Sequence, residues 1–329
     1  MGRPISYYRR FHGYDYSRGV ALFVTIATEP RKAFFGRVEN ASVILSEFGK
    51  AVLEAMRAIP GMNQGISLFE HVLMPDHLHM NLRIAPGLPE PLRFFGAAIR
   101  RFKTFTTTLA RRSFGIERLW QQGCHDRICA SRRFIDATSR YIRYNPLKHE
   151  LMYNQPEFMR VSEPLDTPRL DSDDFWRGMG NVSLLSPETK LLALRVSRKV
   201  RAGDLPRVVA RMEDAVRAGF VIISGFISPG EIAVRDMLIT NRKARFVHIL
   251  PSCMDLRHRP DSRYLEPLAQ GRFLEIAEGN DERDFARDAC LSLNEQIAGM
   301  ALAGEGGALY WQKDGPAFQP GALTTQGRA

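Results

Sequence analysis

Apolar and polar residues alternate along two stretches in the first half of the chain, at 19–28 and 77–84. Side chains two apart on a β-strand point to the same face, so this period of two predicts two half-buried strands. Residues 66–74 are predicted to form another strand between them. A short fourth strand is indicated at 125–129. The Pro-Asp pair at 75–76 is expected to form the turn between the second and third strands, because proline cannot pair within a central ladder.

Residues 41–59 repeat apolar side chains at three- and four-residue spacing, which predicts an amphipathic helix. Residues 89–112 and 131–144 are also predicted to be helical, and Asn145-Pro146 is expected to end the last helix, because the residue before a proline disfavours helical backbone. The order β-α-β-β-α-β-α predicts an α+β fold. We expect a ferredoxin-like antiparallel sheet of four strands, with helices on one face and strand 77–84 in the centre.

The composition changes beyond the predicted helices. Residues 154–183 are rich in Pro, Asp and Gly, which indicates a connecting segment. We therefore expect a first domain at 1–160, a linker at 161–183, a smaller α/β domain at 184–303 and a flexible tail at 304–329.

The smaller domain shows a strand-helix-strand pattern. Strands are predicted at 220–224 and 246–250, and Ser228-Pro229-Gly230-Glu231 reads as a capping box that opens the helix between them. Gly225 and Gly230 near a helix start can also cradle a phosphate. Capping alone explains these residues, so the structural reading is favoured.

Composition narrows the class of protein. The chain has 329 residues, of which 44% are hydrophobic, enough for about two ordinary cores. No apolar run reaches the roughly 18 residues that span a bilayer, and the N-terminus does not resemble a signal peptide. Four scattered cysteines favour neither a disulfide framework nor a zinc knuckle. We expect a cytoplasmic, nucleoid-associated protein with no membrane partner.

The positive charge is unevenly placed. Residues 1–165 hold 24 Lys and Arg against 14 Asp and Glu, whereas residues 166–329 hold 22 of each. The whole net charge of +10 therefore lies in the first half. A basic surface attracts nucleic acid through counterion release, so nucleic acid is the favoured partner.

Two groups of basic residues are candidates for DNA contact. Arg9 and Arg10 lie among aromatic residues near the N-terminus, a mixture that suits single-stranded DNA, although a loosely held basic arm explains it equally well. A basic helix face is predicted on 89–112. Its candidate residues are Arg93, Arg100, Arg101 and Lys103.

Two histidines mark the predicted central strand. His77 and His79 are two residues apart, so they share one face while Leu78 and Met80 point to the core. Two neutral imidazoles on one rigid surface can chelate a divalent metal. The alternative is a pair of half-exposed strand histidines without a ligand.

Tyr141 and Asn145 are four residues apart on a predicted helix and share a face. A phenol can attack a phosphodiester, but it is a poor nucleophile unless something activates it. A metal on the histidine pair would polarise the phosphate. The alternative is an ordinary half-buried helix tyrosine.

Three segments of the first domain occur together: HVLMPDHLHMNLRI at 71–84, LWQQGCHDRI at 119–128 and YIRYNPLKHEL at 141–151. Together they resemble the REP-associated tyrosine transposases of the HUH single-tyrosine superfamily. The resemblance implies a nuclease and strand transferase that acts on single-stranded or hairpin DNA. It also implies a 5′-phosphotyrosine intermediate and Mg²⁺ or Mn²⁺ as cofactor, in a monomer or homodimer.

The resemblance also implies residue roles. His77 and His79 would hold the metal, Tyr141 would be the nucleophile, and Asn145 would supply an amide ligand. Asp76 stands where the family usually has asparagine. Tyr144 and Tyr153 lie close enough in sequence to be rival nucleophiles.

The segment VIISGFISPGEIAVRDML at 221–238 faintly resembles the nucleotide-binding Rossmann-like folds of the DprA and LOG type, without the Pro-Gly-Gly of LOG proteins. Two other functions remain open for the whole chain. It can be a domesticated protein that binds DNA hairpins without cutting them, or a rolling-circle initiator or relaxase.

Overall fold

A computed structural model describes residues 15, 18–165, 167–170, 175–278, 287–312 and 324–325. Its internal contacts divide the chain into two compact units, Met1–Glu150 and Leu151–Ala329. Each unit is described by itself. Within the described ranges, no helix is both long and apolar enough to cross a bilayer.

The first unit is built on an antiparallel sheet of four strands in the order β4-β5-β1-β6. These strands are β1 (Val20–Ala27), β4 (Ile66–Leu73), β5 (His77–Ile84) and β6 (His125–Ile128). Strand β5 lies between β4 and β1, as predicted, and begins at His77. The unit is therefore of the predicted α+β class, with the histidines on a central strand.

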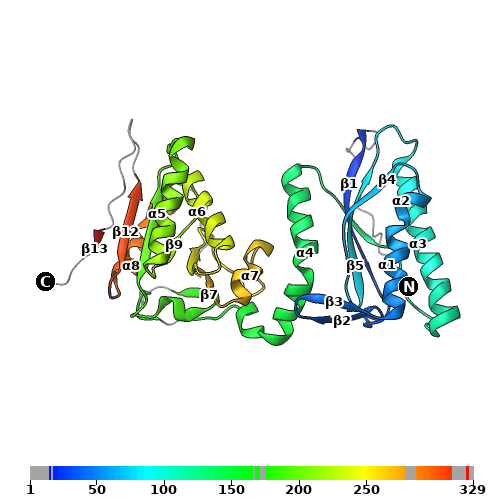
Figure 1. Ribbon diagram of the computed structural model, residues 1–329, viewed down its shortest axis with the longest axis horizontal. Helices are drawn as coiled ribbons and strands as arrows, with labels where there is room; N and C mark the ends of the chain where they lie inside the picture. Colours follow the sequence, from blue (N-terminus) through cyan, green and yellow to red (C-terminus); the bar gives the residue numbers. More distant parts are fainter. Residues whose placement is uncertain are drawn as a thin grey trace, which may run out of the picture. The chain divides into compact units, whose positions relative to one another are not determined.

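One face of this sheet builds the hydrophobic core. Leu22 and Val24 of β1 and Leu78 and Met80 of β5 are buried there. Helices α1 (Glu47–Arg57), α2 (Ile59–Met62) and α3 (Pro91–Phe114) lie on this side (Figure 1). Leu78 and Met80 point to the core as predicted, which turns His77 and His79 to the other face.

Helix α4 (Arg132–Asn154) covers the opposite face, so the prediction of helices on one face is wrong (Figure 1). The predicted end at Asn145-Pro146 is also wrong, because α4 continues through Pro146 to Asn154. Proline removes one helical hydrogen bond. Ile142 and Leu151, on either side of it, are both buried, and this packing offsets the loss.

The helix predicted over 41–59 begins later than expected. A hairpin of β2 (Gly36–Glu39) and β3 (Ser42–Leu45) comes first, and α1 starts only after Ser46, whose side chain accepts a hydrogen bond from the Gly49 N–H. Asn40 and Ala41 join the two strands with φ angles of 52° and 54°. Two consecutive left-handed residues form the turn that hairpins prefer, and an alanine gives little sequence signal for it.

The second unit contains a sheet of seven strands in the order β13-β12-β8-β9-β10-β11-β7. The five central strands, from β12 to β11 in this order, pair in parallel. The edge strands β7 and β13 each pair antiparallel with their neighbour. The strands are β7 (Trp176–Gly180), β8 (Leu191–Val196), β9 (Val221–Ser224), β10 (Phe246–Ile249), β11 (Phe273–Glu278), β12 (Ala308–Gln312) and β13 (Thr324–Thr325).

The predicted linker and tail both contribute strands to this sheet. Strand β7 lies inside the expected linker 161–183, and β12 and β13 lie inside the expected tail 304–329. These strands are short and rich in glycine or follow glycines, and β7 and β12 pair with strands distant in sequence, β11 and β8. Local composition therefore indicated a loop where tertiary pairing forms a strand.

The helices of the second unit are α5 (Leu205–Arg217), α6 (Pro229–Thr240), α7 (Leu265–Ala269) and α8 (Arg287–Leu302). Single 3-10 turns occupy Pro156–Met159, Val182–Leu185, Ala202–Asp204 and Ser262–Tyr264. The predicted capping box is present at the start of α6, with Ser228 and Glu231 each accepting a hydrogen bond from the backbone N–H of the other.

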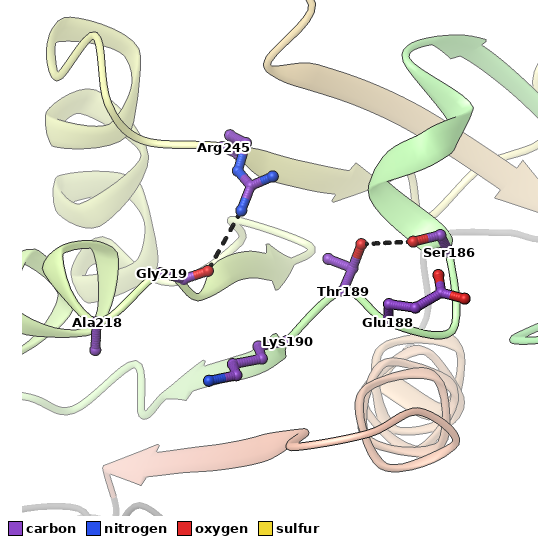
Figure 2. Close-up of a pocket in the computed structure, with 7 residues that line it drawn as sticks. All are labelled: Ser186, Glu188, Thr189, Lys190, Ala218, Gly219 and Arg245. Atoms are coloured by element: carbon purple, nitrogen blue, oxygen red, sulfur yellow. Dashed lines mark hydrogen bonds between the residues drawn. The ribbon is translucent and has the colours of Figure 1, made fainter.

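A pocket of about 320 Å³ opens where β8, β9 and β10 begin (Figure 2). Lys190 and Arg245 bring positive charge to its wall, and Glu188 brings a carboxylate. Ligands of open α/β sheets bind at the carboxyl ends of the strands, and this pocket lies at the amino ends. We assign it no function.

Candidate active site

The histidine pair lies on the α4 side of the first sheet. The ring centroids of His77 and His79 are 4.8 Å apart, with an angle of 77° between the planes. The whole residue His79 is only 5% exposed, whereas His77 is more accessible. The strand therefore presents two adjacent imidazoles on one rigid surface, as the sequence predicted.

Each imidazole is held through its Nδ1 atom. A hydrogen bond of 2.8 Å joins His79 Nδ1 to Thr25 Oγ1 on the neighbouring strand, and Thr25 lies directly opposite His79 in the register. His77 Nδ1 lies 2.5 Å from the Asp76 carboxylate. Such outer partners fix the orientation of a metal-binding imidazole.

The charge state of His79 suits a metal site. Burial, followed by the electrostatic effects of His77, Lys148 and Arg31, lowers the pKa of His79 to about 3. His79 is therefore neutral near pH 7, and metals bind the neutral imidazole. The hydrogen bond from His77 lowers the pKa of Asp76, and Arg31, 3.0 Å from its carboxylate, acts in the same direction.

Asp76 also forms the turn that delivers β5. Its backbone carbonyl accepts hydrogen bonds of 2.9 Å from the Thr28 N–H and from the Thr28 hydroxyl. The turn closes with a 2.8 Å bond from the Met74 N–H to the His77 carbonyl. Asp76 therefore forms the predicted turn and also contacts the His77 ring through its carboxylate.

Tyr141 approaches the histidine pair from α4. Its ring centroid lies 5.2 Å from that of His79, at an angle of 70°. Phe23 completes the group, with ring centroids 5.3 Å from His79 and 5.8 Å from Tyr141. Asn145, one turn further along α4, is buried. The candidate nucleophile and the candidate metal strand thus meet within one unit of one chain.

The two rival tyrosines are placed differently. Tyr153 is 74% exposed near the end of α4. Tyr144 is half-buried and three residues beyond Tyr141 on the same helix. The ring of Tyr141 lies against His79, with 5.2 Å between the ring centroids.

Buried polar groups fix α4 against the sheet. The Asn81 amide Nδ2 donates hydrogen bonds of 3.1 Å to Thr138 Oγ1 and 3.0 Å to Ser139 Oγ. Asn81 lies two residues beyond His79 on β5 and is fully buried. Because Thr138 and Ser139 come immediately before Tyr141 in the same helix, this clamp sets the position of the phenol over His79.

The candidate metal ligands differ in chemical type. His77 and His79 offer imidazole nitrogens on one face of β5, and Asn145, whose side chain is an amide, is buried one turn beyond Tyr141 on α4. Imidazole suits the transition metals, and carbonyl oxygen suits Mg²⁺ and Mn²⁺. Mn²⁺ accepts both kinds of ligand. Across the described part of the chain, no group of three or more His, Cys, Asp or Glu side chains is arranged to hold a metal.

The second unit contains a group of backbone N–H donors of the kind that binds phosphate, but the side chain of Glu231 occupies it. The Glu231 carboxylate accepts hydrogen bonds from the backbone N–H groups of Val196 (3.0 Å), Ile227 (2.8 Å) and Ser228 (3.1 Å). These donors lie at the N-terminus of α6, where a nucleotide phosphate would bind. The structural reading of the capping box is therefore the one that the geometry favours.

The predicted DNA-binding residues fall in two places. Arg9 and Arg10 lie outside the described residues. The other four are on α3, which packs on the core face of the sheet, opposite the histidine pair: Arg93, Arg100, Arg101 and Lys103.

Three of these four side chains are engaged by the protein. Arg93 pairs with Glu90 at 2.9 Å, and Arg101 donates to the Met62 carbonyl at 2.9 Å. Lys103 donates to the carbonyls of Gln121 and Gly123 at 2.6 and 2.7 Å, and burial lowers its pKa.

Other cations, which the sequence reasoning missed, lie on the histidine side. Lys148 Nζ is 5.2 Å from the centre of the Tyr141 ring, and the Arg127 guanidinium is 4.8 Å from the ring of Phe134 on α4. Lys148 is seven residues from Tyr141, which places it on the same helix face. This spacing would have been a signal if the helix had been continued through Pro146.

No known protein-family profile matches the chain. An uncharacterized protein of Haemophilus influenzae (strain ATCC 51907 / DSM 11121 / KW20 / Rd) is 27% identical over 158 residues, which cover 43% of this chain and 88% of that protein.

Three solved structures show distant similarity. A REP-associated tyrosine transposase bound to a REP hairpin is 20% identical, covers 43% of this chain and 73% of its own, and has a TM-score of 0.34. A putative transposase from Deinococcus radiodurans is 22% identical. The match covers 41% of this chain and 95% of the transposase, with a TM-score of 0.25. DNA processing protein A from Helicobacter pylori, described with a single-stranded DNA binding mode, is 12% identical. That match covers 50% of this chain and 86% of the H. pylori protein, with a TM-score of 0.36.

Proposed function

We propose that the first unit is a metal-dependent endonuclease and strand transferase for single-stranded DNA, of the HUH tyrosine transposase type. The observation that supports this most is the contact between the Tyr141 ring and the His79 ring, at 5.2 Å. Tyr141 and His79 are 62 residues apart in sequence, and the fold brings their rings together on one face of the sheet.

In the proposed cleavage step, Tyr141 is the nucleophile. Tyr141 Oη attacks a backbone phosphorus, so that an O–P bond to tyrosine forms and the bond from phosphorus to the 3′-oxygen breaks. The phenolic proton passes to solvent, and the departing 3′-oxygen takes up a proton from solvent. The products are a 5′-phosphotyrosine and a free 3′-hydroxyl, which can reverse the reaction without ATP.

His77, His79 and Asn145 would hold the Mn²⁺ or Mg²⁺ ion. When bound there, the cation supplies charge neutralisation and orientation to the scissile phosphate. Thr25 and Asp76 hold the two imidazoles through Nδ1. The low pKa of His79, about 3, keeps that imidazole ready to bind a cation at neutral pH.

The proposed substrate is a DNA hairpin with a single-stranded flank. The flank would cross the α4 side of the sheet, where Phe23 and Tyr141 present aromatic rings and Arg127 and Lys148 present positive charge. Bases stack on aromatic side chains while cations meet phosphates. We propose that the second unit is a Rossmann-like domain that does not use the N-terminus of α6 for a nucleotide phosphate, because Glu231 occupies those donors.

The test is a covalent-adduct assay with the full-length chain. Hairpin oligonucleotides labelled at either end are incubated with Mn²⁺ and resolved on a denaturing protein gel. We expect the label on the 3′ side of the cut to migrate with the protein. Tyr141→Phe abolishes the adduct and Tyr144→Phe, its matched control on the same helix, retains it.

Two results would redirect the proposal. An adduct that persists in Tyr141→Phe would remove the assigned nucleophile. Tight hairpin binding by the unmodified chain, with no adduct under any divalent cation, would favour the alternative of a DNA-hairpin-binding protein that does not cleave.

A further inference from the structure

Lys148 and Tyr141 belong to one continuous helix. The Lys148 ammonium lies 5.2 Å from the centre of the Tyr141 ring. Seven residues span about two helical turns, so the two side chains lie on the same face of α4. This arrangement depends on α4 passing through the buried Pro146 without ending.

The ammonium is only partly exposed to solvent. Lys148 is half-buried, so water screens its charge less than it screens that of a surface lysine. The positive charge therefore acts strongly on the phenol ring beside it.

Two arginines of the same region are committed to acidic partners. Arg31 lies 3.0 Å from the Asp76 carboxylate, and Arg143 lies 3.1 Å from the Glu70 carboxylate. The charges of these two arginines are therefore partly neutralised.

A phenol gains negative charge on its oxygen and ring as it becomes a nucleophile. A cation beside the ring attracts a neutral phenol weakly through the π face and a phenolate much more strongly. An interaction that strengthens on the way to the transition state accelerates the chemical step. The scissile phosphate adds further negative charge at the same place.

We propose that Lys148 is a catalytic residue, whose ammonium stabilises the developing phenolate of Tyr141 and the phosphate that it attacks. This inference rests on the proposed function of the first unit. It supplies the activation that a tyrosine nucleophile needs. Lys148 donates no proton and accepts none, so the atoms and electrons balance as in the cleavage step described above.

The test compares Lys148→Met with Lys148→Arg. Single-turnover adduct formation is measured with saturating hairpin DNA and Mn²⁺. We expect Lys148→Met to lower the rate by roughly 10- to 100-fold and Lys148→Arg to remain within a few-fold of the unmodified chain. Lys50→Met, on the exposed surface of α1, is the matched control.

A second measurement separates catalysis from binding. DNA affinity is determined in a Tyr141→Phe background with and without Lys148→Met. We expect the affinity to change much less than the rate. Equal losses of rate and affinity, or no loss of rate in a folded Lys148→Met protein, would overturn the role of Lys148 alone. Absence of any adduct in the unmodified chain would overturn the proposed function as well.

Discussion

Thr25→Val tests whether the neighbouring strand holds the histidine pair for metal binding. Valine keeps the shape of threonine and removes the hydroxyl that lies 2.8 Å from His79 Nδ1. Because His79 is 5% exposed, water cannot readily replace this partner. Leaving a buried polar atom unpaired costs about 1–3 kcal/mol. Loss of an outer hydrogen bond to a metal-binding histidine lowers metal affinity or activity by roughly 10- to 100-fold.

Two measurements check this prediction. Chemical unfolding should show a stability loss of about 1–3 kcal/mol. The Mn²⁺ concentration that gives half-maximal adduct should rise by roughly 10- to 100-fold. Thr25→Ser keeps a hydroxyl and should restore most of both. Thr108→Val removes a hydroxyl from the exposed face of α3 and should alter neither. A Thr25→Val protein with an unchanged Mn²⁺ dependence would refute the outer-partner reasoning.

Three further predictions concern packing, pH and DNA binding. Gly230→Ala should destabilise the second unit by about 1–3 kcal/mol in urea unfolding, because a Cβ there would meet the Val196 side chain; Val196→Ala should relieve the loss, and no relief would contradict the clash. Burial alone would raise the pKa of Glu275, but hydrogen bonds from two histidines lower it to about 2, from an ordinary value of 4.5. The unfolded chain therefore binds more protons between these pH values, so the free energy of unfolding, measured in urea, should fall as pH drops from 4.5 towards 2. The fall is at most about 1.4 kcal/mol per pH unit, and Glu275→Gln should lack this dependence. Arg127→Gln should weaken single-stranded DNA binding more than Arg100→Gln does in salt titrations. Removing one cation that neutralises a phosphate should lower the slope of log affinity against log salt concentration by about 0.7. A larger effect of Arg100→Gln would indicate that the DNA binds on the α3 side.

The sequence predicted β5 to the residue because its signals are local. Period-two alternation and the preceding Pro75 both act within a few residues of His77. The same local reasoning was wrong at Pro146, where the rule for residues before proline ended a helix that continues to Asn154. Packing of distant residues against α4 overrides the proline, and no local pattern reports that packing.

The position of the basic helix face shows a second limit. The sequence identified α3 as helical and basic, but periodicity does not state which face of a sheet a helix covers. Its buried side chains, such as Phe95 and Phe102, belong to the core on the side opposite the histidines. Charge counts along the chain therefore identified the cations of α3 without locating them relative to the histidines, and they did not single out Lys148 beside Tyr141.

The polar face of the first sheet explains why α4 and the site belong together. His79, Asn81 and Thr25 are buried or half-buried on that face, and each has a hydrogen bond to another residue of the sheet or to α4. Without α4, the amide of Asn81 would lose Thr138 and Ser139, and water would have to replace them. An apolar residue at position 81 would pack at least as well against a helix, so stability alone does not favour asparagine. A directional amide fixes the rotation and register of α4, which a smooth apolar contact leaves free to slide. Tyr141 reaches His79 in only one register of α4. The polar face therefore lowers the stability of the packing somewhat and fixes the position of the phenol.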